Sequence, residues 1–310
     1  MHQTTMRRAA AMRLGTRKRT VQRCRAQGDG NTQRRTVRKT LTRKISGDDF
    51  RHPLDQKNTA LLRALPGFST LARAAVGSVA EQAMLLENVG SCVRVGETQL
   101  PKMHRMHTEA AAILGLDPAP ELYVRQDPQP NAYTLAVSGR TPFVVIHTAL
   151  LELLDMNELQ AVLAHEMGHL KCDHGVWLSM ALAMADGATR MPGLGGLLAT
   201  PMQDGLLRWL RAAELTCDRA ALLVVQDSKV VVSALMKLAG GSPSIANELN
   251  VDAFLEQARS YDQATRSPMG WYLRNAQTRQ LSHPLPVLRA REIDRWANSP
   301  EYRALVGTAE

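Results

Sequence analysis

The sequence predicts an α+β fold that is mainly helical and contains one small β-sheet. Hydrophobic residues make up 45% of the 310 residues and charged residues 22%, which is an ordinary globular composition and excludes a wholly disordered chain. Segments with helical periodicity account for most of the chain after residue 60. Strand-like runs, rich in β-branched and aromatic residues, occur only between residues 120 and 150.

Two helical segments precede the predicted sheet. The first covers residues 61–89 and is interrupted at Pro66–Gly67, because proline does not continue a helix. The second covers residues 100–114 and ends at Gly115, a residue type that commonly follows the last turn of a helix.

Three strands are then expected, at residues 121–125, 131–138 and 143–147. Ser138–Gly139 is typical of a turn and lies between the last two strands. These segments are short and close together in sequence, so they predict a small sheet.

Helices follow the sheet. Asp155, with Glu158 three residues later, forms a capping-box pattern that predicts a helix through Leu170. Another helix is expected at residues 206–225, and further helices from residue 230 onward.

Residues 1–45 differ sharply from the rest of the chain. They hold 14 of the 38 Lys and Arg residues but one of the 29 Asp and Glu residues, together with eight threonines. Such a segment is expected to be disordered, and its composition is typical of an organellar transit peptide. We therefore predict a transit peptide at 1–45, a globular domain at 46–300 and a C-terminal tail at 301–310. The alternatives are a basic arm that binds nucleic acid and a merely solvated terminus.

The rest of the composition limits the function classes. Aromatic residues make up only 4%, which argues against an aromatic platform for nucleic acid. The four cysteines form no CxxC pair, which fits a reducing compartment. No stretch of the sequence reaches 18 consecutive apolar residues, so a conventional membrane-spanning helix is not expected. Two short apolar runs, 176–185 and 194–199, are expected to form a helical hairpin packed on the domain, and contact with a lipid surface is the alternative.

The predicted helix that starts at Asp155 carries a metal-binding pattern, His165-Glu166-Met167-Gly168-His169. Residues four apart on a helix share a face, so both histidines can bind one metal ion. Glu166 follows the first histidine and is placed to take a proton from a water on that metal. The alternative is an ordinary helix with two hydrogen-bonded histidines. We interpret His174, a few residues later, as structural.

A catalytic zinc needs a third protein ligand, for which Glu214 is the best candidate. Asp218 shares its helix face and is suited to accept the free ring N–H of a ligating histidine. The alternative is that both acids are solvated and balanced by Arg211 and Arg219. Cys217 is a competing soft ligand, which we interpret as a packing residue.

Taken together, these motifs resemble the HtpX and type I CaaX prenyl-protease family of zinc metallopeptidases (gluzincins), and among them the soluble-looking cyanobacterial and plastid members. The motifs are, in chain order, Asn131-Ala132-Tyr133-Thr134, His165 to His169, Glu214 with Asp218, and Ser282-His283-Pro284 followed by Arg289. The long membrane helices of that family have no counterpart in the two short apolar runs, so cleavage of prenylated substrates within a membrane is not expected.

The resemblance implies a zincin-like fold, with the small sheet beside the helix of the two histidines, and a zinc-dependent endopeptidase activity. It implies one Zn²⁺ per chain, bound by His165, His169 and Glu214, with Glu166 as general base and acid. It also implies that Asp218 is the partner of His165, that His283 faces the reaction intermediate and that Arg289 supports this region. Asn131, Ala132 and Tyr133 would bind a substrate strand.

The expected partners are protein or peptide substrates, with a peripheral membrane or lipid-droplet surface as a further candidate. No nucleic acid is expected to bind the mature form. The resemblance also implies a plastid location, with a mitochondrial one as the alternative. The rival function is a catalytically silent peptidase-fold scaffold or a protein that binds a lipid surface.

Overall fold

The computed structural model describes residue 41 and residues 44–66, 79–136, 141–190, 195–279 and 281–307. All of them belong to the second of two units into which the chain divides, Arg38–Glu310. Nearly all of the predicted transit peptide, and the predicted turn at Ser138–Gly139, therefore lie outside the described residues.

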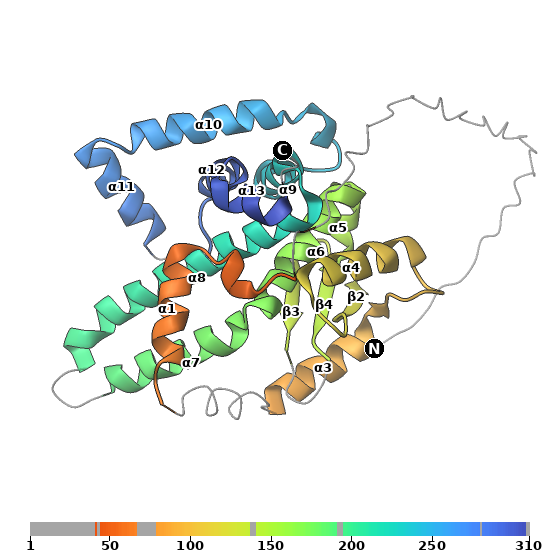
Figure 1. Ribbon diagram of the computed structural model, residues 1–310, viewed down its shortest axis with the longest axis horizontal. Coiled ribbons are helices and arrows are strands. Elements are labelled where there is room, and N and C mark those ends of the chain that lie inside the picture. Colours follow the sequence, from red (N-terminus) through yellow and green to blue (C-terminus); the bar gives the residue numbers. More distant parts are fainter. Residues whose placement is uncertain are drawn as a thin grey trace, which may run out of the picture. The chain divides into compact units, whose positions relative to one another are not determined.

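The sheet has four strands in the order β1-β2-β4-β3 (Figure 1). The central strands β2 (Glu121–Arg125) and β4 (Phe143–His147) run parallel, and both were predicted to the residue. β1 (Val93–Arg94) and β3 (Ala132–Leu135) pair antiparallel at the two edges. β3 is shorter than the predicted strand at 131–138. β1 was not predicted, because two residues are too few to show an alternating pattern.

The helices follow one another along the chain as α1 (Pro53–Arg63), α3 (Val79–Ser91), α4 (Pro101–Leu114), α5 (Thr148–Leu153), α6 (Met156–Lys171), α7 (His174–Thr189), α8 (Gly195–Val225), α9 (Ser228–Gly240), α10 (Val251–Ala264), α11 (Pro268–Thr278), α12 (Pro286–Ala297) and α13 (Pro300–Val306). Short 3-10 helices lie at Gly47–Asp49 and Ala246–Glu248. The mainly helical α+β fold is confirmed.

Local signals account for the ends of several helices. α6 begins with the predicted capping box: the Asp155 side chain accepts from the backbone N–H of Asn157 and Glu158, and the Glu158 side chain accepts from that of Asp155. α4 ends at Gly115, whose φ of 63° lies in the left-handed region that glycine tolerates best.

The prediction that the first helix starts at residue 61 is wrong. α1 starts at Pro53, and the ring of His52 accepts from the backbone N–H of Leu54 at its N-terminus. Proline is favoured at the first helical position because its fixed φ suits the helix. The residues that follow Pro53 are mostly polar, so they lack the apolar periodicity on which the prediction relied.

Helices cover both faces of the sheet (Figure 1). On one face, Leu85 of α3 packs with Tyr123 and Val145. On the other face, the alternate residues Leu122 and Ile146 pack with α4, α5 and α6. Because β4 is buried at every position, its sequence is a continuous apolar run, as expected for a central parallel strand.

α6 lies between two hydrophobic clusters. Leu159 and Leu163 pack in the cluster that includes the sheet, whereas Ala164 and Met167 pack in the cluster formed with α8, α9 and α12. Contacts on two sides fix the rotation of α6 about its axis. They therefore also fix the direction of the face that carries His165.

α7 and α8 pack against each other (Figure 1), as predicted for the helical hairpin, and α8 also contacts α6 and α1. α8 begins near the second apolar run and continues to Val225, so the hairpin and the predicted helix at 206–225 share one long helix. Within the described part of the chain, no helix is both long and apolar enough to span a membrane.

Candidate metal centre

α6 and α8 approach closely at Gly168. A Cβ atom on Gly168 would lie 3.0 Å from Ala220 Cβ and 3.1 Å from Cys217 Cα, closer than side chains normally pack. Glycine at this position therefore lets the two helices meet. Their contact brings Glu214, one turn before Asp218 on α8, to the histidines of α6.

The Glu214 carboxylate lies against both histidines of the predicted pattern. Its Oε2 is 3.4 Å from His165 Nε2, and its Oε1 is 3.4 Å from His169 Nε2. Zinc bonds to nitrogen and oxygen are about 2.0–2.2 Å long in a tetrahedral site, which separates two ligand atoms by about 3.4 Å. Two imidazole nitrogens and one carboxylate, at these separations, fit a zinc ion.

The electrostatics of the three side chains are coupled. Burial by itself lowers the pKa of His165, but hydrogen bonds to Asp218 and Glu214 outweigh burial and raise that pKa to about 9. Burial alone would raise the pKa of Glu214, but hydrogen bonds from His165, His169 and His283 hold it well below its usual value. The carboxylate is therefore ionised and can act as a metal ligand.

Asp218 lies behind His165. Its Oδ1 is 3.0 Å from His165 Nδ1, and the Arg289 guanidinium donates to both carboxylate oxygens at 2.6 and 2.8 Å. Burial tends to raise the pKa of Asp218, but the positive charge of Arg289 outweighs burial and lowers it. An ionised carboxylate only accepts hydrogen bonds, so His165 donates from Nδ1, and Nε2 is the nitrogen that a metal can bind in place of a proton.

Neither acid is solvated, so the alternative in which Arg211 and Arg219 balance them does not hold. Glu214 and Asp218 are 7% and 2% exposed. Arg211 donates instead to the backbone carbonyls of Arg279 and Leu281, and Arg219 pairs with Glu292. Burial of two carboxylates one turn apart requires compensating cations or donors, which Arg289 and the histidines supply.

Cys217 is the other candidate ligand near the histidines. One ligand atom each from His165, His169 and Cys217 also lie within 4.8 Å of one another. The thiol contacts His174 Nδ1 at 3.6 Å, and burial raises the pKa of Cys217 well above its usual value. The thiol thus faces His174, whereas the Glu214 carboxylate faces Nε2 of both histidines, so the geometry favours Glu214.

Three other predicted residues lie around this centre. Glu166 is half-buried on α6, next to His165. His283 precedes α12, is 67% exposed at its side chain, and lies with Nδ1 2.9 Å from Glu214 Oε2, a hydrogen bond that raises the pKa of His283. Arg289, on the first turns of α12, reaches Asp218 rather than solvent.

The strand that was predicted to bind a substrate, β3 with the preceding Asn131, lies beside α6. β3 contacts α6, and none of the described strands pairs with its outer edge. The carbonyl of Asn131 accepts from the backbone N–H of His147, Ala132 is half-buried, and the Tyr133 hydroxyl donates to Asn88 Oδ1 at 2.6 Å. The Tyr133 side chain is thus engaged with α3, so only the backbone of this strand is free to pair with a substrate.

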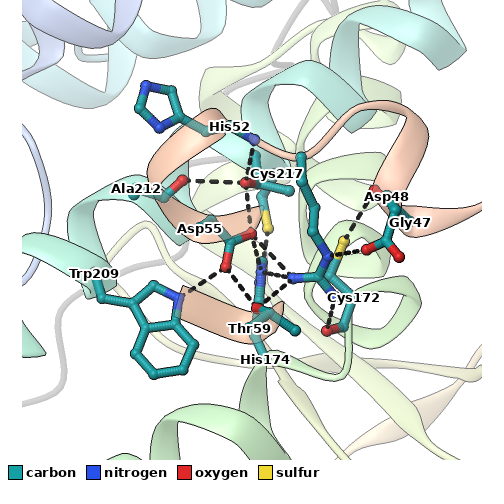
Figure 2. Close-up of polar contacts among 12 residues, drawn as sticks. Gly47, Asp48, His52, Asp55, Thr59, Cys172, His174, Trp209, Ala212 and Cys217 are labelled. Carbon is teal, nitrogen blue, oxygen red and sulfur yellow. Dashed lines mark hydrogen bonds and ion pairs between the residues drawn. The ribbon is translucent and has the colours of Figure 1, made fainter. Parts of the chain in front are cut away.

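A second buried polar group, which we call the Asp55 cluster, is shown in Figure 2 and contacts His169 through His174. It consists of Arg51, Asp55, Thr59, His174, Trp209 and Thr216. Asp55 is 0% exposed and accepts at Oδ2 from Thr216 at 2.8 Å and from Arg51 at 3.1 Å. Trp209 Nε1 donates to its other oxygen at 2.8 Å.

The Asp55 cluster was not predicted from the sequence. Asp55 and Arg51 are four residues apart, a common surface pairing, and nothing local indicates that they are buried. Asp55 and Thr216 are 161 residues apart, so only the packing of α1 on α8 brings them together. Removing one partner of a buried ion pair typically costs about 3–5 kcal/mol, so the cluster holds α1 firmly in place.

Comparisons with known proteins find one family model and several relatives that match this chain. The model of peptidase family M48 matches residues 97–297. A protein of Arabidopsis thaliana, plastoglobule-localized metallopeptidase 48, chloroplastic, is 63% identical over 89% of this chain and 80% of its own length. A protease HtpX homolog of Ralstonia nicotianae is 27% identical over 50% of this chain and 62% of its own. Protease HtpX homolog 2 of Methanosarcina acetivorans is 28% identical over 53% of this chain and 64% of its own length.

Proposed function

The chain belongs to peptidase family M48 and is thus a metallopeptidase, and from this membership we propose that it is a zinc-dependent endopeptidase that hydrolyses proteins or peptides. The observation that carries the proposal is the Glu214 carboxylate, placed 3.4 Å from the Nε2 atoms of both His165 and His169. These three residues would hold the zinc ion, and Cys217 would pack beside it.

Bound zinc would supply a Lewis acid for the scissile carbonyl and for the attacking water. Glu166, which lies beside His165, would accept a proton from the attacking water and deliver it to the leaving amine. His283 lies on the exposed side of Glu214, from which it can donate to the developing negative charge. A substrate strand pairs with the free backbone edge of β3.

Purified residues 46–310 are expected to hold about one zinc ion per chain, because the proposed ligand set has three protein donors and closes around one ion. Metal analysis after gentle purification measures this directly. A denatured protein such as casein should be degraded by the zinc-loaded chain and spared after treatment with a chelator. A purified chain without zinc, or chelator-resistant degradation, would contradict the proposal.

The predicted plastid location is confirmed, since the 63% identical relative is chloroplastic and plastoglobule-localized by name. We further propose that residues 1–45 are the transit peptide and are removed on import. N-terminal sequencing of the protein isolated from plastids is expected to start near residue 46. A mature protein that starts at Met1 would contradict this, and would favour the basic arm.

We also propose that the chain contacts a lipid surface through α11 rather than through the α7–α8 hairpin. α11 exposes Trp271 and Tyr272 at 62% and 63%, and Met269 and Leu273 beside them. Tryptophan and tyrosine favour the boundary between lipid and water. Arg274 lies on the same helix and adds a positive charge that suits anionic headgroups.

Flotation with vesicles of phosphatidylcholine and phosphatidylglycerol tests the lipid contact. The double variant W271E/Y272E is expected to lose most of its vesicle binding, because two charged side chains cannot enter the apolar boundary. L182E/L197E, which alters exposed residues of α7 and α8, is the matched control and should still float. The reverse result would place the contact on the α7–α8 hairpin.

A further inference from the structure

His174 connects the Asp55 cluster to the candidate metal centre. It is the first residue of α7 and is 1% exposed. Its Nε2 lies 3.0 Å from Asp55 Oδ2, and its Nδ1 lies 3.1 Å from His169 Nδ1. Both ring nitrogens therefore have a partner, and Figure 2 shows the one on the Asp55 side.

The direction of each hydrogen bond follows from Asp55. An ionised carboxylate can only accept, so His174 donates from Nε2. A neutral imidazole with its proton on Nε2 is an acceptor at Nδ1. His169 must then donate from its own Nδ1, which leaves the lone pair of His169 on Nε2. That nitrogen is the atom that lies 3.4 Å from the Glu214 carboxylate.

We propose that Asp55 and His174 are positioning residues, which fix His169 in the tautomer that directs its Nε2 lone pair at the metal. The inference rests on the proposed role of His169 as a zinc ligand. Arg51 donates to Asp55 Oδ2 at 3.1 Å, and the thiol of Cys217, 3.6 Å from His174 Nδ1, is a second and weaker donor to that nitrogen. Cys217 thus acts in this arrangement as a donor, with no role as a ligand.

The two histidines of α6 are then held in the same way. His165 is oriented directly by Asp218, which Arg289 binds, and His169 is oriented through His174 by Asp55, which Arg51 binds. Arg51 and Asp55 lie before residue 97, outside the region that the family model matches. The segment around α1 therefore contributes to the metal centre although none of its residues would contact the ion.

Two substitutions of His174 separate the two hydrogen bonds. In His174→Asn, the amide replaces Nδ1 of the ring, so its oxygen can still accept from His169 but no longer reaches Asp55. In His174→Gln, the amide replaces Nε2, so its nitrogen can still donate to Asp55 but leaves His169 without an acceptor. Both variants lose one buried hydrogen bond and remain similar in size and polarity.

Zinc affinity is measured by competition with a chelator on the full chain. We expect it to fall about 10–100-fold in His174→Gln, which is the usual range when the partner of a ligating histidine is lost. In His174→Asn the affinity should fall clearly less. Thermal unfolding of the chelator-treated proteins reports stability separately. Ser233→Ala is the control: it removes a 2.6 Å hydrogen bond to buried Glu158 of α6, away from the centre, and should lower the Tm without changing zinc affinity.

Equal zinc affinities of the Asn and Gln variants would overturn the inference, and so would a zinc affinity that merely follows the Tm across all three variants. A wild-type chain that binds no zinc would overturn the zinc proposal together with it. Lower affinity in the Gln variant than in the Asn variant, at similar Tm, would support the positioning role, because a purely structural role predicts no difference between them.

Discussion

Glu166→Gln is expected to keep its zinc and lose its peptidase activity. Glutamine has nearly the size and shape of glutamate, but its amide cannot accept a proton, and a positioned general acid–base group is typically worth about 10²–10⁴-fold in rate. Casein degradation and metal content, measured on the same preparation, check both parts of the expectation. His165→Ala should differ from it by losing the metal as well.

Glu152→Gln is a matched control for this substitution, because Glu152 is an exposed residue of α5 with no place in the proposed centre. It should leave activity and zinc content unchanged. If Glu166→Gln kept full activity, the proposed mechanism would be wrong. If the wild type bound zinc but cleaved no peptide or protein, the catalytically silent scaffold would become the better interpretation.

Substitution of Glu214 is expected to weaken zinc binding more than substitution of any other residue of α8. Glu214→Ala removes one of three proposed protein ligands, so the loss of affinity should go well beyond the about 10–100-fold typical of an outer partner. Asp218→Asn alters only the group that orients His165, so its loss should fall within that range. Chelator competition on purified variants gives the order.

Cys217→Ser is the control on the same helix. The serine hydroxyl can still donate to His174 Nδ1, so zinc affinity should change little. A variant series in which Cys217→Ser lost zinc while Glu214→Ala retained it would mean that the ligands are two histidines and a thiolate. The 4.8 Å grouping of His165, His169 and Cys217 would then be the true site.

The sequence alone was sufficient for features that depend on neighbouring residues. The capping box of α6, the glycine at the end of α4 and the two central strands all rest on contacts within a few residues, or on burial of one continuous apolar run. The same holds for His165 and His169, because residues four apart on a helix share a face wherever the helix packs. Local patterns also fail where they are weak, as in polar α1 and two-residue β1.

The tertiary structure decided everything that depends on how helices pack. Glu214 was predicted as the best candidate for the third ligand, with Cys217 as a competing one, and the close contact of α6 and α8 at Gly168 places the Glu214 carboxylate against both histidines. Asp218, 53 residues from His165, was predicted as its partner through the family resemblance, whereas Asp55 on α1, 119 residues from His174, was not predicted. No local periodicity encodes such pairs, because a buried polar side chain finds its partner only when separate helices are brought together. The sequence therefore determined which chemistry the chain carries, and the packing of α1, α6 and α8 determined which residues orient it.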